Sequence, residues 1–401
     1  MRKVLKLILI LALFSFLISG CTKQSTTPST QAVWQKTFGG SYNDEAYSIQ
    51  QTTDGGYIVA GYTYSFGAGG SDVYVIKLDE NGNKVWEKTY GGSGDDYAFS
   101  IQQTTDGGYI VAGYTSSFGE GNYDFYIIKL DANGNKLWEK TFGGSYNDKA
   151  YSIQQTTDGG YIVAGSTISF GEGGSDVYVI KLDKNGDKVW EKTFGGIADD
   201  EAKSIQQTTD GGYIVAGYTF SFGEGGSDVY VIKLYENGNE SWEKTFGGNG
   251  WDEASFIQQT NDEGYIVAGY TFSFGEGWDD VYVIKLDKNG NKVWDKTYGG
   301  GNGDRANSIQ QTKDGGYIVA GMTSSLGAGN YDFYIIKLDA NGNKLWEKTF
   351  GGSKYDPAWS IQQTNDGGYI VAGSTISFGA GGSDIYVIKL DENGNTAPYP
   401  Q

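Results

Sequence analysis

The sequence contains no histidine, a single cysteine and only 4 prolines in 401 residues. Without histidine the chain cannot use Ser-His-Asp or Cys-His catalysis, imidazole proton transfer or histidine-ligated zinc. Because Cys21 is the one cysteine, no intrachain disulfide or thiolate cluster can form. The chain has 30 basic and 49 acidic residues, and its formal net charge of −19 disfavours binding of nucleic acid and phosphate ligands. A surface with this negative charge is compatible with binding cations, sugars or protein segments.

Glycine and aromatic residues are abundant. The chain has 64 glycines, 31 tyrosines, 19 phenylalanines and 10 tryptophans. Disordered low-complexity chains have few aromatic and β-branched residues to bury, so this composition indicates a folded protein. Many short strands joined by glycine turns would account for it. We therefore expect an all-β fold.

The N-terminus resembles a secretory signal. Arg2, Lys3 and Lys6 precede an apolar stretch at 7–18, which is typical of a signal peptide and too short to span a bilayer. We predict a signal peptide at 1–20. Export would place the remainder of the chain outside the cytoplasm.

The residues before the cysteine resemble the bacterial lipobox. In that motif, cleavage occurs before a cysteine that is then diacylated, and Ile18-Ser19-Gly20-Cys21 matches it. We predict that lipidated Cys21 anchors the chain to the membrane and that 21–32 form a flexible polar tether. An ordinary signal peptide with a chance cysteine is the alternative. The anchor would lie in the outer membrane of a Gram-negative cell, or in the outer face of the cell membrane of a Gram-positive one.

Tryptophan recurs every 52 residues and marks seven near-identical repeats. Each repeat has four strand-like segments, two of them almost continuously apolar, as in strands buried on both faces. Asp-Gly-Gly and Asn-Gly turns join the segments as hairpins. This pattern predicts a seven-bladed β-propeller at 33–395, with a superhelical β-solenoid as the alternative. The repeated tryptophans are Trp34, Trp86, Trp138, Trp190, Trp242, Trp294 and Trp346, and the first repeat's segments are 46–52, 56–63, 72–78 and 85–90.

The ends of the array predict how the ring closes. The array begins with a fourth-type strand at 33–38, whereas the last repeat supplies only three strands at 358–391. The last blade would otherwise expose an unpaired strand edge, which is unfavourable. We predict that the N-terminal strand completes the seventh blade and that 396–401 form a C-terminal tail.

The segment LDENGNKVWEK at 78–88 resembles the tryptophan-docking repeat of quinoprotein-type propellers. In those proteins the indole stacks on the backbone of a neighbouring blade around an Ala-Gly pair, which Ala60-Gly61 would match here. The whole repeat is similar to the glycine-rich arrays of bacterial and archaeal cell-surface proteins, most of which have no assigned chemistry.

One face of the predicted propeller varies between repeats. The loops that join fourth to first strands differ most, and binding residues tend to lie on loops held by a rigid scaffold. Three tryptophans outside the series, Trp251, Trp278 and Trp359, lie on or beside this face, together with Arg305. Exposed aromatic residues can stack on sugars or anchor a protein, so we interpret these four as candidate ligand contacts. Drift at loop positions is the alternative.

Aspartates recur in two rings on the same face. We expect each carboxylate to accept backbone N–H bonds and hold a glycine loop in shape. Calcium bound by oxygen-rich loops is the alternative, and no other cofactor is expected. The first ring is Asp44, Asp96, Asp148, Asp200, Asp252, Asp304 and Asp356, and the second is Asp72, Asp124, Asp176, Asp228, Asp280, Asp332 and Asp384.

These observations favour a monomeric binding or scaffold protein that presents its variable face to a polysaccharide or a protein. A structural envelope component, similar to the propeller lipoprotein that assists outer-membrane barrel assembly, is one alternative. An enzyme is another. A carboxylate-based glycosidase or lyase needs no histidine, but no acid outside the repeat pattern stands out. A quinone-dependent enzyme would need cofactor residues that break the repeat, and few do.

We predict that metabolic labelling with a palmitate analogue marks the protein. Cys21→Ala should abolish the label and release the protein from membranes, because the acyl chains would be its hydrophobic anchor. Cell fractionation with immunoblotting measures the release. Membrane attachment that persists in the variant would contradict the anchor.

Overall fold

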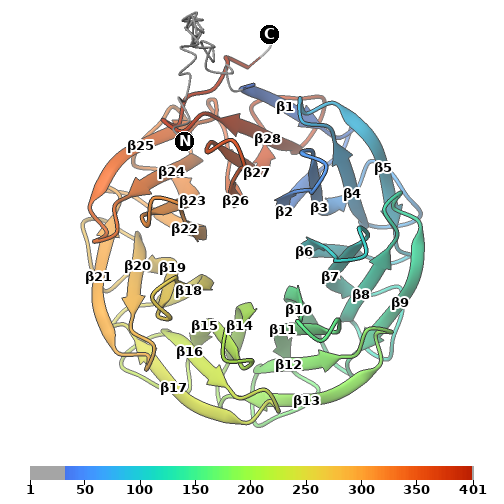
Figure 1. Cartoon of the computed structure of the whole chain (residues 1–401), viewed down its shortest axis with the longest axis vertical. Helices are drawn as coiled ribbons and strands as arrows, with labels where there is room; N and C mark the ends of the chain where they lie inside the picture. Colours follow the sequence, from blue (N-terminus) through green and yellow to red (C-terminus); the bar gives the residue numbers. More distant parts are fainter. Residues whose placement is uncertain (1–31, 400–401) are drawn as a thin grey trace, which may run out of the picture. The chain divides into compact units, whose positions relative to one another are not determined.

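The computed structural model describes residues 32–399. The predicted signal peptide, Cys21 and almost all of the predicted tether lie outside the described residues. The described part is built from 28 strands, and it contains no helix that could cross a membrane. The strands form seven four-stranded antiparallel sheets around a ring, as Figure 1 shows. The predicted seven-bladed β-propeller is therefore confirmed.

In each of the first six blades the strands follow one another from the centre of the ring outward (Figure 1). The strand bounds of these blades are β2 (Asp44–Gln51), β3 (Tyr57–Thr63), β4 (Asp72–Leu78) and β5 (Lys84–Tyr90); β6 (Asp96–Gln103), β7 (Tyr109–Thr115), β8 (Asp124–Leu130) and β9 (Lys136–Phe142); β10 (Asp148–Gln155), β11 (Tyr161–Thr167), β12 (Asp176–Leu182) and β13 (Lys188–Phe194); β14 (Asp200–Gln207), β15 (Tyr213–Thr219), β16 (Asp228–Leu234) and β17 (Glu240–Phe246); β18 (Asp252–Gln259), β19 (Tyr265–Thr271), β20 (Asp280–Leu286) and β21 (Lys292–Tyr298); and β22 (Asp304–Gln311), β23 (Tyr317–Thr323), β24 (Asp332–Leu338) and β25 (Lys344–Phe350).

The two middle strands of each blade form the core. In the first blade every residue of β4 is buried, and so is all of β3 except Tyr62. Both faces of these strands pack against neighbouring blades, which explains their nearly continuous apolar sequence. The turn after β4 contains Gly82 at a φ of +72°, a conformation that favours glycine and closes the hairpin.

The N-terminal strand closes the ring. The seventh blade contains β26 (Ala358–Gln363), β27 (Tyr369–Thr375) and β28 (Asp384–Leu390), and its outer strand is β1 (Trp34–Phe38). The β1–β28 register runs from Trp34 opposite Lys389 to Phe38 opposite Ile385. Strands from the two ends of the chain thus share one sheet, as the repeat count predicts.

The described part of the C-terminal tail packs against this closing strand. The Gln35 side chain donates a hydrogen bond to the carbonyl of Ala397 at 2.6 Å, and the Thr37 hydroxyl lies 2.8 Å from that of Tyr399. The Tyr399 ring stacks on Phe378 with 4.4 Å between centroids. The tail therefore adds side-chain contacts to the seventh blade, in which β1 pairs with β28.

The repeated tryptophans join neighbouring blades, but not at the predicted Ala-Gly pair. A Cβ added to Gly134, in the Asn-Gly turn of the next blade, would lie 2.9 Å from the Trp86 ring. The same ring meets Tyr109 edge-on at 6.0 Å. Gly61 lies instead against the backbone of Glu45 and of Ala46, its cross-strand partner. Docking on the Asn-Gly turn recurs at all seven seams, including Trp34 on Gly82.

We predict that deleting residues 33–40 lowers the melting temperature far more than deleting 396–401. The first deletion removes the β1 ladder and the docked Trp34, leaving β28 as an open edge. The second deletion removes only the side-chain contacts of the tail. Thermal unfolding followed by circular dichroism measures both, and equal melting temperatures would contradict the closure scheme.

Candidate functional site

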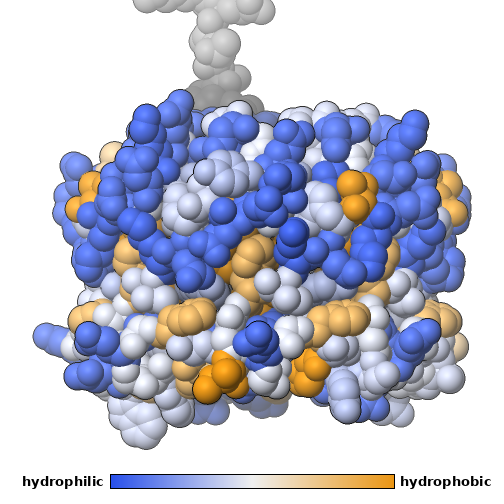
Figure 2. All heavy atoms as spheres, turned by 90° about the horizontal axis from the view of Figure 1, so that it is seen from below, coloured by the Kyte–Doolittle hydropathy of each residue, from blue (hydrophilic) through white to orange (hydrophobic). Residues whose placement is uncertain are grey.

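Loops at one end of the ring form the variable face, which we define as the loops before each innermost strand and those between the second and third strands. In the first blade these loops are held together by the backbone N–H of Tyr64, which donates to the carbonyl of Asn43 at 2.9 Å. The innermost strands β2, β6, β10, β14, β18, β22 and β26 begin at this face and line the central channel (Figure 1). The outer wall seen in Figure 2 is strongly hydrophilic over its upper half and mixed, with several hydrophobic spots, over its lower half.

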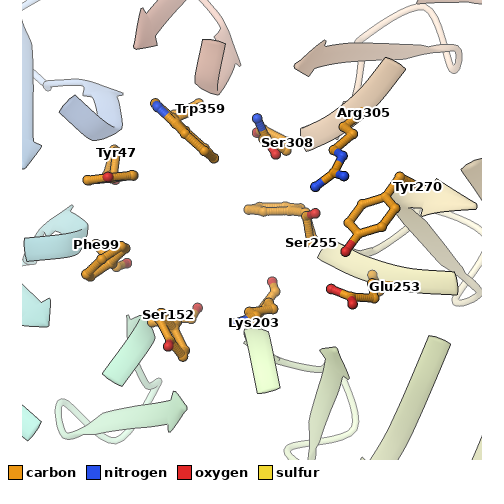
Figure 3. A pocket seen from close by; sticks show the side chains of 18 of the residues that line it. Tyr47, Phe99, Ser152, Lys203, Glu253, Ser255, Tyr270, Arg305, Ser308 and Trp359 are labelled. Atoms are coloured by element: carbon orange, nitrogen blue, oxygen red, sulfur yellow. The ribbon is translucent and has the colours of Figure 1, made fainter. Parts of the chain in front are cut away.

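A cavity of about 470 Å³ occupies the channel near the variable face (Figure 3). We call it the cup. Two consecutive positions of every innermost strand line it. At the first position the seven repeats carry Tyr47, Phe99, Tyr151, Lys203, Ser255, Asn307 and Trp359, and at the second they carry Ser48, Ser100, Ser152, Ser204, Phe256, Ser308 and Ser360.

A β-bulge accounts for this arrangement. The pairing of β2 with β3 passes through Ala46 and resumes at Ser48, so Tyr47 has no partner in the ladder. The same shift occurs in all seven innermost strands. A bulge re-aims side chains, which lets both Tyr47 and Ser48 line the channel. The unpaired residue can therefore vary between repeats without disturbing the sheet.

One side of the cup is a continuous aromatic wall. The Trp359 and Tyr47 rings lie 5.2 Å apart between centroids, and Tyr47 lies 4.6 Å from Phe99. Phe99 meets Tyr151 edge-on at 5.4 Å. The ammonium of Lys203 ends the wall, lying 4.0 Å from the centre of the Tyr151 ring in a cation–π contact. Four successive blades thus supply one aromatic surface (Figure 3).

The opposite side of the cup carries most of its polar groups, although Phe256, Tyr270 and Met322 also line it. Arg305 pairs with Asp279 and lies 4.3 Å from the centre of the Tyr270 ring. Asn307 donates to the carbonyl of Ala358 at 2.7 Å.

Lys203 and Glu253 complete the polar side. Lys203 forms an ion pair with Glu201 at 2.5 Å. Burial raises the pKa of the Glu253 carboxyl, against the opposing effects of a hydrogen bond from Tyr270 and the charges of Lys203 and Arg305. The cup therefore combines an aromatic wall with hydrogen-bonding groups and with charged groups of both signs.

The structure brings together two of the four predicted ligand contacts. Trp359 and Arg305 both line the cup, from β26 and β22, and Arg305 belongs to the strand rather than to the loop before it. Trp251 and Trp278 are 55% and 77% exposed on loops of the variable face and do not line the cup. A ligand role for any of these four residues stays a prediction.

Sequence reasoning missed Tyr47, Phe99, Tyr151 and Lys203. Their signal was present, since they occupy the second of two variable positions in the frame Asp-x-Ala-x-Ser-Ile-Gln-Gln, which is otherwise constant except for Phe256. From the sequence alone that position is interpreted as part of a variable loop, because the residue types do not indicate a bulge that faces the channel.

The aspartate rings hold the loops of the variable face. Asp44 is fully buried and accepts hydrogen bonds from the backbone N–H of Gly40 and the hydroxyl of Ser65, each at 2.7 Å. Asp72 accepts from the backbone N–H of Ala68 at 2.8 Å. Within residues 32–399 no group of three or more acidic, histidine or cysteine side chains is arranged to hold a metal. A calcium role for these rings stays a prediction.

Carboxylates of the two rings face each other across each seam. Burial, together with the nearby charge of Asp44, raises the pKa of Asp384 to about 6. Asp176 and Asp280 also have their pKa raised to about 6, by burial together with the charge of a facing aspartate. The folded protein therefore binds protons that the unfolded chain releases.

Comparison with known proteins places this architecture among propellers. The family model described as outer membrane protein assembly factor BamB matches residues 71–303 and 175–397, and a β-propeller domain of unknown function matches 52–84. These matches confirm the predicted resemblance to quinoprotein-like repeats. The regulatory protein FlaEY of Caulobacter vibrioides is 27% identical over 265 residues, which are 61% of this chain and 25% of FlaEY. The chain thus spans about a quarter of the length of that curated relative.

Solved structures share the fold at low identity. The Pan2 WD40 domain of Neurospora crassa has a TM-score of 0.53 at 12% identity, covering 92% of this chain and 98% of that chain. Puromycin hydrolase has a TM-score of 0.52 at 12% identity, covering 88% of this chain and 52% of that chain. Identities this low show the propeller fold alone.

We predict that the melting temperature rises as the pH falls from about 7 to about 5. A folded-state pKa near 6, above the unfolded value near 3.8, contributes stability that is complete at low pH and lost as the pH rises through 6. With no histidine in the chain, no imidazole titrates in this window. Thermal unfolding measures the change.

Two controls separate the paired aspartates from the overall negative charge. High salt, about 1 M NaCl, screens exposed charges but leaves buried pairs largely unscreened. The rise in melting temperature at low pH should therefore persist in high salt. Asp384→Asn, which cannot titrate, should show a smaller gain than the unaltered chain. A gain that vanishes in salt would contradict the assignment to these carboxylates.

Proposed function

This chain belongs to the family of the outer membrane protein assembly factor BamB, and from that premise we propose that it is a non-catalytic binding propeller of the cell envelope. Its variable face would hold a macromolecular partner, a polysaccharide or a protein. The predicted lipid anchor would attach the propeller to the membrane, outside the cytoplasm. The chain would act as a monomer.

The observation that carries this proposal is the uneven distribution of variation over the repeats. Seven blades share one backbone and nearly one sequence, yet the cup-lining bulge carries six kinds of side chain in seven copies. Binding sites lie where a rigid scaffold presents variable groups. The aspartates, in contrast, recur in every blade and are engaged in holding loops, which argues for a structural role rather than an active site.

Two exposed tryptophans extend the proposed surface to its rim. Trp278 is 77% exposed and Trp251 is 55% exposed, its ring 5.7 Å from Phe272. Exposed indoles of this kind are typical anchors at protein and sugar interfaces. We assign them to outer contacts with the partner, distinct from the cup.

A protein partner in envelope assembly is the second candidate. The family description favours it, since the family model matches more than half of the chain. The aromatic wall of the cup favours a polysaccharide. Both candidates use the same face of the ring and differ in the chemistry of what is bound.

Photo-cross-linking in the producing cell tests the proposal. A benzophenone amino acid at Trp278, on the variable face, should capture an envelope component, because the probe would lie within reach of the partner. The matched control is Lys184, exposed in a turn at the opposite end of the ring. Digestion of the adduct with protease or glycosidases then distinguishes protein from polysaccharide. Equal capture from both positions, or none from Trp278, would contradict the proposal.

A further inference from the structure

We propose that the cup is a binding site for a neutral saccharide, such as a short oligosaccharide or the end of a polysaccharide chain. This inference rests on the proposed function and narrows it to one site and one class of ligand. It uses the aromatic wall, the paired charges opposite it and the shape of the cavity (Figure 3).

The aromatic wall suits the apolar faces of sugar rings. Trp359, Tyr47, Phe99 and Tyr151 are each partly exposed, and adjacent centroids are 4.6 to 5.4 Å apart. A wall built from four blades is longer than a single sugar ring requires, and it curves with the channel. Aromatic residues with part of their surface open in a cavity offer large contact area at low cost in conformational entropy.

The facing groups suit hydroxyls rather than anions. Lys203 and Arg305 are the cations that line the cup, and both are already paired, with Glu201 and Asp279. No unpaired positive charge among the lining residues is therefore available for a phosphate or sulfate. The net charge of −19 adds long-range repulsion of anionic chains.

Hydrogen-bonding groups of both kinds are nevertheless present in the cup. Ser255 and Ser308 can donate and accept, Asn307 carries an amide, and Glu253 carries a carboxyl. Sugar hydroxyls also donate and accept, so they match this mixture. A purely apolar ligand would leave these groups unsatisfied, which costs free energy.

The shape of the cavity favours a small ligand or a chain end. The volume of about 470 Å³ lies in the range of small-ligand pockets, about 300–1,000 Å³. Below it the channel continues as a smaller space of about 200 Å³. Phe256 and four of the serines at the second bulge position line both spaces and mark the level at which the two meet.

Isothermal titration of the purified full chain with cellotriose, maltotriose, chitotriose and mannotriose tests the inference. At least one trisaccharide should bind, and a sulfated form of it should bind more weakly by about tenfold or more. Trp359→Ala and Tyr47→Ala should each weaken binding by about tenfold or more, because truncated central aromatic contacts typically lose this much. Tyr146→Ala, a tyrosine 63% exposed on the same face outside the cup, should leave binding unchanged.

The design keeps folding and function apart. Phe99→Leu retains an apolar side chain while removing the ring, so its loss of binding at an unchanged melting temperature would report stacking even if the alanine variants fail to fold. Failure of every trisaccharide to bind, or binding unaffected by Trp359→Ala, would overturn the inference. If no trisaccharide binds while cross-linking from Trp278 still captures a partner, the binding propeller stands and the saccharide site falls.

Discussion

Hydrogen bonds between the innermost strands of neighbouring blades hold the ring, and the rest of the structure depends on them. The Gln50 side chain accepts from the backbone N–H of Gln103 at 2.6 Å, and the Gln103 side chain accepts from the backbone N–H of Thr53 at 2.8 Å. This reciprocal pair recurs at all seven seams, including the one between the last blade and the first. Because every seam uses the same bonds, the seven innermost strands are held at equivalent positions around the channel.

That constancy is what allows the cup to vary. A residue at the bulge, such as Tyr47, takes no part in the ladder, so its side chain can be exchanged while the seam bonds stay in place. In the fifth repeat the second bulge position also changes, and Phe256 replaces the serine found in the other six repeats. At five other seams that serine accepts from a backbone N–H of the next blade, as Ser308 does from Ile361 at 3.3 Å, whereas Ser204 donates to the carbonyl of Ile257 at 3.5 Å. The phenylalanine cannot, yet the glutamine bond beside it remains, from Gln311 to Gln258 at 2.7 Å.

A symmetric ring thereby carries an asymmetric site. At the first bulge position, aromatic side chains come from the last blade and the first three, and polar ones come from the three blades between them. The two sides meet where Lys203 lies over Tyr151. Side chains from all seven blades meet at the channel and line one cavity of about 470 Å³, a volume in the range of small-ligand pockets.

The sequence by itself determined the fold of this protein, because period, turns and strand count are local properties written in every repeat. The 52-residue spacing, the Asn-Gly turns and the lone fourth-type strand at 33–38 predict seven blades and a ring closed by β1. Tertiary structure alone decided the docking partner of the tryptophans and the composition of the cup. Gly134 meets Trp86 across a seam, and Trp359 meets Tyr47 although the chain separates them by most of its length. Such neighbours depend on how the ring closes and on a bulge that leaves no mark in residue spacing, so only the folded chain reveals them.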